Sequence, residues 1–356
     1  MKIGVIAPLF FPIPPKTYGG TEIVIYNLVE GLVKNGHEVT LFACNGTKVS
    51  AKLDQKWNRQ FDITKVGARE AVYRTNRLNY IASMSDRFDI LHNHDAISSI
   101  LVEEEFKCPF VTTWHSSFEG HTEIYPDYKK RMLETKFVSI SNSQREGLPM
   151  GKFVATVYNG TVDFNDYKFG RGGKYLVWIG RFDKSKGPDD AVKMALKAKK
   201  ELILAGAKLS GKQKSFFDKS IKEYVDNKQI KFIGEVNLEQ KVSLLQKAKA
   251  FLMPIHWEEP FGLVMIEAMA CGTPVIAYNR GSVPEIIEDG KNGFIVKENN
   301  INGMVKAIAK LDTIDRKYCR ESVKRRFSIE KMVEGYEKVY KKVIKEYKKE
   351  KNNESN

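Results

Sequence analysis

The sequence predicts an α/β protein built from two successive doubly wound units, each a parallel sheet flanked by helices. The chain has 356 residues, enough for about two domains of roughly 150 residues each. Short apolar runs alternate with segments of helical period, as in repeated strand–helix–strand units. A polar, glycine-rich break at residues 159–173 separates two such series. We therefore expect one unit over residues 1–165 and a second over residues 166–327.

The first unit is expected to begin with a strand at residues 3–7. A loop through Gly19-Gly20 then leads to a helix over residues 21–34 that stops at Asn35-Gly36. Further strands are predicted at residues 37–43, 90–92, 110–113, 137–140 and 153–157. Further helices are predicted between residues 93 and 106 and over residues 128–135. The polar region at residues 48–85 shows no readable period.

The second unit repeats this alternation after the break. Its strands are predicted at residues 175–179, 202–205, 230–233, 250–253 and 293–296, with another between Gly272 and Gly281. Its helices are predicted from Pro188, at residues 215–226 and 238–248, from Phe261, and at residues 301–311. A last helical segment, about residues 328–350, has no strand after it. We expect that helix to pack back on the first unit.

Composition narrows the class of partner. Lys and Arg number 58 against 44 Asp and Glu, a formal charge of +14 that favours anionic partners. Part of this charge lies at residues 341–351, which form either a solvated basic helix or a membrane-binding surface. The four cysteines are far apart in sequence and form no CxxC pair, which favours a reducing compartment over disulfides or structural zinc. No apolar run is long enough to span a bilayer, so we expect a cytoplasmic protein, with peripheral contact at the inner membrane face as a compatible addition.

The stretch from Pro254 to Glu285 has the features of a ligand site. Pro254 ends a buried apolar run, and Glu258 and Glu259 follow where that strand stops. A nearly all-apolar helix begins at Phe261, and its acidic residue, Glu267, must be solvated or meet a polar partner. The first amides of this helix, contributed by Phe261, Gly262 and Leu263, can donate to phosphate or sugar oxygens. The pattern indicates a site for a polyhydroxylated, anionic ligand.

Two other loops carry groups that bind phosphate. Residues 180–187 (GRFDKSKG) follow a predicted buried strand and contain Arg181 and Lys186, which suit a diphosphate or form a charged surface turn. Gly19-Gly20 allows close backbone approach to a ligand, or makes a tight turn, and is not a GxGxxG motif. No P-loop and no GxSxG elbow occurs, which argues against kinase and hydrolase classes.

Histidines follow two strands of the first unit. The sequence His92-Asn93-His94-Asp95 lacks evident third and fourth metal ligands, so lining a cleft is a better reading than binding a metal. His115 stands alone after the strand at residues 110–113, where it is either structural or ligand-facing. Ser139-Ile140-Ser141 and Asn159-Gly160 end two further strands, where turn chemistry is an ordinary explanation.

A long pattern in the second unit resembles a known family. Residues 259–277 read EPFGLVMIEAMACGTPVIA, with Glu259 and Glu267 in an E-x7-E spacing, and RGSVPE follows at residues 280–285. This pattern resembles the signature of family 4 retaining glycosyltransferases, which have the GT-B fold of two Rossmann-like domains facing across a cleft. The resemblance continues through Gly180-Arg181, Lys186-Gly187, Phe232-Ile233-Gly234, Tyr158-Asn159-Gly160, Thr113-Trp114-His115, His92-Asn93-His94 and Tyr18-Gly19-Gly20-Thr21-Glu22.

The resemblance implies a nucleoside diphosphate sugar as donor, UDP- or GDP-linked, bound mainly by the second domain. Arg181 and Lys186 would hold the diphosphate and Glu267 the ribose hydroxyls. Glu259 would contact the transferred sugar, helped by the amides of Phe261, Gly262 and Leu263. His115 would lie at the reacting face, and Gly19 and Gly20 near the phosphates. The departing phosphate would help to deprotonate the acceptor hydroxyl on the same face of the sugar, without a metal.

Other readings keep part of this pattern. A nucleotide-sugar epimerase or a glycoside phosphorylase would share the fold, and a transferase is separated from both by the release of nucleoside diphosphate in step with acceptor glycosylation. A basic nucleic-acid or membrane-surface binding protein belongs to another class, but the basic residues are dispersed and form no motif interleaved with aromatic residues. We expect saccharide or lipid-linked acceptors and no nucleic acid. Residues 48–85 and 165–174 match nothing specific, and the acceptor stays undefined.

Overall fold

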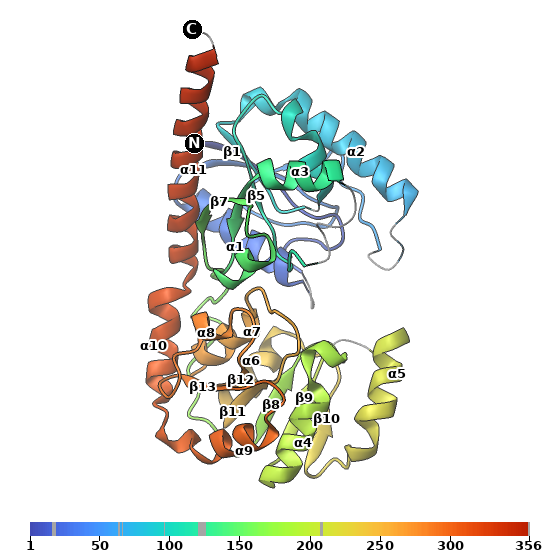
Figure 1. Cartoon of the computed structure of the whole chain (residues 1–356), viewed down its shortest axis with the longest axis vertical. Helices are drawn as coiled ribbons and strands as arrows, with labels where there is room; N and C mark the ends of the chain where they lie inside the picture. Colours follow the sequence, from blue (N-terminus) through green and yellow to red (C-terminus); the bar gives the residue numbers. More distant parts are fainter. Residues whose placement is uncertain are drawn as a thin grey trace. The chain divides into compact units, whose positions relative to one another are not determined.

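The computed structural model describes residues 1–15, 19–62, 65, 67–95, 97–119, 126–206 and 209–354, in two compact units (Figure 1). The first unit comprises Met1–Gly160 together with Ile329–Asn356, and the second comprises Thr161–Ser328. The division falls a few residues before the position expected from the sequence. Tyr18, which belongs to the motif around Gly19-Gly20, lies outside the described residues.

In the described part of the first unit, seven parallel strands form one sheet in the order β3-β2-β1-β4-β5-β6-β7. The strands are β1 (Lys2–Ile6), β2 (Glu38–Phe42), β3 (Lys52–Asp54), β4 (Ile90–Asn93), β5 (Phe110–Thr113), β6 (Lys136–Ser139) and β7 (Lys152–Thr156). All four residues of β4 and of β5 are buried, as expected of a parallel sheet covered on both faces.

Helices cover this sheet. They are α1 (Gly20–Lys34), α2 (Ala68–Ser83), α3 (Pro126–Glu134) and α11 (Ile329–Glu354), with the 3₁₀ helices η2 (Ser85–Arg87), η3 (Ile97–Glu105) and η4 (Ser143–Gly147). Both β3 and α2 lie in the region without a readable period, and η3 is a 3₁₀ helix where an unspecified helix was predicted. The other predicted elements of this unit occur within a few residues of their expected bounds.

The helix α2 escaped prediction because the first part of its buried face is charged, and apolar buried residues begin only at Leu78. Glu70, Arg74 and Arg77 are all less than 7% exposed, where apolar residues would mark a helical stripe. Arg74 contacts Glu70, and both arginines pair with Asp95, which follows β4. Arg77 also donates to the carbonyl of Ala7 at 3.0 Å. This ion-pair network ties α2 to the loops that follow β1 and β4.

The terminal helix α11 belongs to the first unit. Its buried residues recur at helical spacing: Met332, Val333, Tyr336, Val339, Tyr340 and Val343. It packs against α1 and the edge strand β7 (Figure 1). Glu337 accepts hydrogen bonds from Asn35 and His37 near the end of α1. No helix among the described residues is both long and apolar enough to cross a membrane.

The described part of the second unit has six parallel strands in the order β10-β9-β8-β11-β12-β13. They are β8 (Leu176–Ile179), β9 (Leu202–Ala205), β10 (Ile230–Phe232), β11 (Ala250–Met253), β12 (Val275–Tyr278) and β13 (Gly293–Val296). The helices are α4 (Pro188–Ala198), α5 (Gly211–Ser220), α6 (Leu238–Lys247), α7 (Leu263–Ala270), α8 (Val283–Ile286), α9 (Ile301–Ala309) and α10 (Arg316–Arg326). The 3₁₀ helices are η5 (Lys184–Lys186), η6 (Lys222–Tyr224) and η7 (Leu311–Thr313).

Each sheet has a point where the strand order reverses, and doubly wound proteins bind ligands in the crevice outside the strand ends at such a point. In the first unit this point lies between β1 and β4, and in the second between β8 and β11. In the second unit, the amide of His256 after β11 donates to the carbonyl of Ser185 after β8 at 2.7 Å. The predicted site loops therefore lie at the positions that the topology favours.

A glycine allows the loops after β8 and β11 to touch. Gly187 has φ 65°, and a Cβ added to it would lie 1.9 Å from the carbonyl oxygen of Pro254. Any side chain at this position would push the two loops apart. The spacing of Lys186 from the residues after β11 therefore depends on Gly187.

We predict that Gly187→Ala destabilises the second unit far more than Gly290→Ala. Gly290 has a similar φ of 74°, but nothing lies within 4 Å of its added Cβ. Gly290→Ala should cost about 1 kcal/mol for the left-handed backbone alone, and Gly187→Ala about 3 kcal/mol or more because of the clash. Urea unfolding of both variants measures the difference. Equal losses would show that the close approach to Pro254 is unimportant.

Candidate active site

A partly buried ion pair joins the loops after β8 and β11 in the second unit. Lys186 Nζ lies 2.5 Å from Glu259 Oε2, and the Glu259 side chain is only 11% exposed. Trp257 Nε1 donates to the same oxygen at 2.9 Å, and the lysine ammonium lies 4.4 Å from the Trp257 ring centroid. The structure thus brings together two residues that the sequence analysis assigned to one site. It adds Trp257, which the sequence analysis did not single out.

The loop that carries Lys186 is held from several sides. Trp178 Nε1 donates to the Lys186 carbonyl at 3.1 Å, and Asp183 caps the short helix η5 by accepting from the Lys186 amide. Arg181, in the same loop, is 43% exposed and lies 3.5 Å from Asp183. The predicted cationic loop therefore has one anchored cation and one accessible cation.

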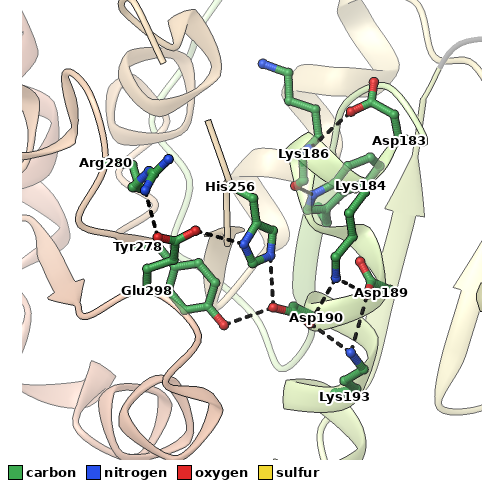
Figure 2. Close-up of polar contacts among 11 residues, drawn as sticks. Asp183, Lys184, Lys186, Asp189, Asp190, Lys193, His256, Tyr278, Arg280 and Glu298 are labelled. Carbon is green, nitrogen blue, oxygen red and sulfur yellow. Dashed lines mark hydrogen bonds and ion pairs between the residues drawn. The ribbon is translucent and has the colours of Figure 1, made fainter. Parts of the chain in front are cut away.

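A charged network lies beneath this loop (Figure 2). His256 is placed between two carboxylates, with Nε2 3.1 Å from Asp190 and Nδ1 3.1 Å from Glu298. Tyr278 donates to Asp190 at 3.1 Å. Burial tends to raise the pKa of Asp190, but the hydrogen bond from Lys193 and the nearby lysine charges outweigh it, so this pKa is lowered. Through its contacts with Asp190 and Glu298, His256 connects the loop after β11 to α4 and to the loop after β13.

The two adjacent glutamates after β11 have different roles. Glu258 is 43% exposed, pairs with Arg280 at 3.0 Å, and accepts from the Gly281 amide at 2.5 Å. The Glu259 carbonyl accepts from the Ser282 amide at 2.9 Å. Glu258 thus holds the loop after β12 in place. Glu259 turns its carboxylate towards Lys186.

Glu267 is buried on α7 with one carboxylate oxygen fully engaged. Tyr167 donates to Oε1 at 2.8 Å, and Lys241 lies 2.7 Å from the same oxygen. Burial, followed by the Glu267 charge, raises the pKa of Tyr167, so the phenol stays a donor. The other oxygen, Oε2, has no hydrogen-bond partner among the described residues. A buried carboxylate oxygen of this kind needs a donor, which a ligand hydroxyl can provide.

The start of α7 differs from the prediction. The helix begins at Leu263, because Gly262 has φ 76° and forms the left-handed N-cap. Phe261 was expected to open the helix, but it is 2% exposed and its ring packs 5.8 Å from that of Phe327. Its carbonyl accepts from the Ser282 hydroxyl at 2.8 Å. The helix-terminal amides therefore start at Leu263 rather than at Phe261.

Three histidines gather at the strand ends of the first unit. His94 Nδ1 lies 2.8 Å from His115 Nε2, and His94 Nε2 lies 3.2 Å from His92 Nδ1. His92 and His94 are buried and His115 is half-buried. Among the described residues, no group of three or more His, Cys, Asp or Glu is arranged to hold a metal ion. The cluster is a hydrogen-bonded array of rings.

The predicted glycines open the first helix of the same unit. Gly19 is the N-cap of α1, and Gly20 is its first residue. A Cβ added to Gly19 would lie 2.7 Å from the Pro15 side chain. A position of Gly19 and Gly20 near the phosphates stays a prediction.

Several residues of the site were not foreseen. Tyr167 lies in the polar break that carried no motif, and Lys241 lies on the otherwise ordinary amphipathic helix α6. His256 and Trp257 lie within the predicted stretch but were not assigned roles. The one available signal was the requirement that Glu267, on an apolar helix, must find polar partners.

Two doubly wound units with charged strand-end loops place the chain among α/β proteins that share this architecture, and comparison with known families specifies the class. The model of glycosyl transferases group 1 matches residues 161–326, and that of glycosyltransferase family 4 matches residues 18–145. Together the two matches cover most of the chain. The chain belongs to the family 4 glycosyltransferases, and is therefore a glycosyltransferase.

Relatives support this assignment over most of their lengths. A glycosyltransferase of Methanocaldococcus jannaschii is 25% identical, with 83% of this chain and 85% of that protein covered. A phosphatidyl-myo-inositol mannosyltransferase of Mycolicibacterium smegmatis is 24% identical, with 86% of this chain and 84% of that protein covered. Among solved structures, Anabaena HepE in complex with UDP and glucose matches with a TM-score of 0.72 at 17% identity, covering 96% of this chain and all of that one. The likeness confirms the predicted GT-B fold class.

We predict that Lys241→Met destabilises the protein and that Glu267→Gln restores most of the loss. Removing the ammonium leaves the buried Glu267 charge with Tyr167 alone, which should cost about 3 kcal/mol or more. Replacing the carboxylate by a neutral amide in the double variant removes that charge. Denaturant unfolding of both single variants and the double variant measures the coupling. Additive losses would contradict a direct Lys241–Glu267 interaction.

Proposed function

We propose that this glycosyltransferase moves a hexosyl group from a nucleoside diphosphate sugar to a hydroxyl acceptor, with retention of anomeric configuration. One observation carries the donor assignment: Glu267 Oε2 is buried and unpaired among the described residues, in the same unit as the cations Arg181 and Lys186. Ribose hydroxyls are donors that suit this oxygen, and a diphosphate is an anion that suits those cations.

The Lys186–Glu259 pair fits a site that exchanges partners when the donor binds. A phosphate oxygen would compete with Glu259 Oε2 for the ammonium, which lies 2.5 Å away in this structure. Glu259, released from Lys186, would then accept from hydroxyls of the transferred sugar while Trp257 still donates to it. The pair therefore keeps both charges compensated until the ligand supplies new partners.

The chemistry follows from where charge develops. As the glycosidic bond breaks, negative charge grows on the leaving diphosphate, and cations already fixed in place stabilise it. Lys186 is held by its loop, and Arg181 is accessible to a second phosphate oxygen. In the proposed route, the leaving phosphate accepts the proton of the attacking acceptor hydroxyl on the same face of the sugar. This route needs no carboxylate nucleophile beneath the anomeric carbon.

The donor is proposed to be UDP- or GDP-linked, and UDP gains support from its presence in the Anabaena homologue of the same fold. For the acceptor we propose a saccharide or a lipid-linked molecule. A relative named as a phosphatidyl-myo-inositol mannosyltransferase makes a lipid acceptor reasonable. Peripheral contact with anionic lipid through the lysine-rich end of α11 would suit such an acceptor.

We predict that Arg181→Ala and Glu259→Ala each abolish transfer without unfolding the protein, since one cation and one sugar-binding carboxylate are lost. The measurement is nucleoside diphosphate release with acceptor glycosylation, after a thermal-shift screen of UDP-, GDP- and ADP-sugars selects the donor. Glu239→Gln, an exposed carboxylate on α6, is the matched control and should retain activity. Near-wild-type transfer by either alanine variant would overturn the site assignment. Product formation without diphosphate release would favour an epimerase or a phosphorylase.

A further inference from the structure

A continuous hydrogen-bonded chain runs from His115 through the first unit to the terminal helix. His115 Nε2 meets His94 Nδ1 at 2.8 Å, and His94 Nε2 meets His92 Nδ1 at 3.2 Å. His92 Nδ1 also lies 2.7 Å from the Tyr340 hydroxyl, and its Nε2 lies 2.8 Å from Thr113 Oγ1. Thr113 in turn lies 3.0 Å from the Tyr336 hydroxyl. These hydrogen bonds thus join the ends of β4 and β5 to α11.

The pKa shifts of these histidines and tyrosines favour the neutral form of every ring at neutral pH. Burial lowers the pKa of His115 to about 4 and holds the pKa values of His92 and His94 well below their usual range. The neighbouring imidazoles lower the pKa values of His92 and His94 further. Burial also raises the pKa values of Tyr336 and Tyr340, so both phenols keep their protons. A neutral imidazole has one N–H donor and one acceptor nitrogen.

This series of hydrogen bonds determines which nitrogen of His115 carries the proton. Among the described residues, Tyr340 has His92 Nδ1 as its one hydrogen-bond partner, so its hydroxyl proton is directed there. His92 is then protonated at Nε2 and donates to Thr113. Tyr340 occupies the single lone pair of His92 Nδ1, and a second lone pair on His94 Nε2, 3.2 Å away, would repel it. His94 therefore carries its proton at Nε2, which leaves His94 Nδ1 as the acceptor for His115 Nε2–H.

The remaining nitrogen of His115 is available to a reactant. Within the part of the chain that the structure describes, its Nδ1 has no hydrogen-bond partner. Because His115 carries its proton on Nε2, Nδ1 is unprotonated and can accept a hydrogen bond. A hydroxyl of the transferred sugar or of the acceptor is a donor of the matching chemistry.

We propose that His94 is a positioning residue for sugar transfer, which fixes the ring and the tautomer of His115 so that Nδ1 accepts a hydrogen bond from a reactant hydroxyl. The inference rests on the proposed function, because the role of His115 at the reacting face comes from the family resemblance. His92, Thr113 and the two tyrosines of α11 hold His94 from behind. No proton is transferred along the chain in this role, which is orientation only.

The test compares His94→Phe with His94→Asn and with a control, His37→Asn. Phenylalanine keeps the ring but removes both hydrogen bonds, whereas asparagine retains an acceptor near the position of Nδ1. His37 is another histidine of the first unit that contacts α11, but it takes no part in the hydrogen bonds that link His115 to Tyr340. We expect kcat to fall tenfold or more in His94→Phe, to recover partly in His94→Asn, and to stay near wild type in His37→Asn. Donor binding, measured by titration with the selected nucleoside diphosphate, should be unchanged in all three.

The pH profile separates positioning from a loss of packing. The titratable groups that face His115 are His94 and His92, with Tyr336 and Tyr340 beyond them. In wild type the active, neutral His115 should persist down to about pH 4. In His94→Phe, water admitted beside the ring should raise the His115 pKa towards its usual value. As the pH falls, the variant should therefore lose activity at a higher pH than wild type does.

Nuclear magnetic resonance of the full chain labelled with ¹⁵N-histidine provides a direct readout, since the chain has 6 histidines. The prediction is an Nε2–H tautomer for His115 in wild type, and a mixture of tautomers in His94→Phe and Tyr340→Phe. An Nδ1–H tautomer in wild type, or a folded His94→Phe variant with unchanged kcat and pH profile, would overturn the proposal. Absence of transfer and of donor binding in wild type would instead overturn the proposed function.

Discussion

The approach of the loop after β8 to the loop after β11 is the contact on which the site in the second unit depends. These strands are neighbours at the point where the strand order reverses, so residues far apart in sequence meet there. Gly187 leaves room for the Pro254 carbonyl, and the His256 amide binds the Ser185 carbonyl. Lys186 and Glu259 can form their short ion pair only because the backbones are already fixed.

Buried charge is arranged in the same manner in both units. In the first, Arg74 and Arg77 pair with Asp95 beside the loops after β1 and β4. In the second, Lys186 and Lys241 compensate Glu259 and Glu267. Breaking such a pair leaves an uncompensated buried charge, so each one holds its loop or helix in a single arrangement. In the second of these pairs, Glu267 Oε2 has no hydrogen-bond partner among the described residues, so a ligand donor could complete the network there.

Structural features that depend on the local pattern of residues could be predicted from the sequence. The strands β8, β9 and β11 are local features, and all three occur as expected. The sequence could not predict α2, whose buried face is charged in its first part, nor the partnership of Glu267 with Tyr167 and Lys241, which depends on how the chain folds back. The start of α7 at Leu263 follows from the backbone of Gly262, which sequence periodicity does not report. The histidine chain needs β4, β5 and α11 together, and only the tertiary fold supplies that.

We propose that the second unit binds a nucleoside diphosphate through its cationic loop and through Glu267. Titration calorimetry with the preferred nucleoside diphosphate, its monophosphate and its 2′,3′-dideoxy analogue tests it most directly. Loss of the second phosphate should weaken binding about tenfold or more, because charge-assisted bonds from Arg181 and Lys186 are lost. Loss of the ribose hydroxyls should weaken it by a similar factor, because Glu267 Oε2 is left without a donor. Equal affinity for all three ligands would show that neither the cationic loop nor Glu267 binds the nucleotide.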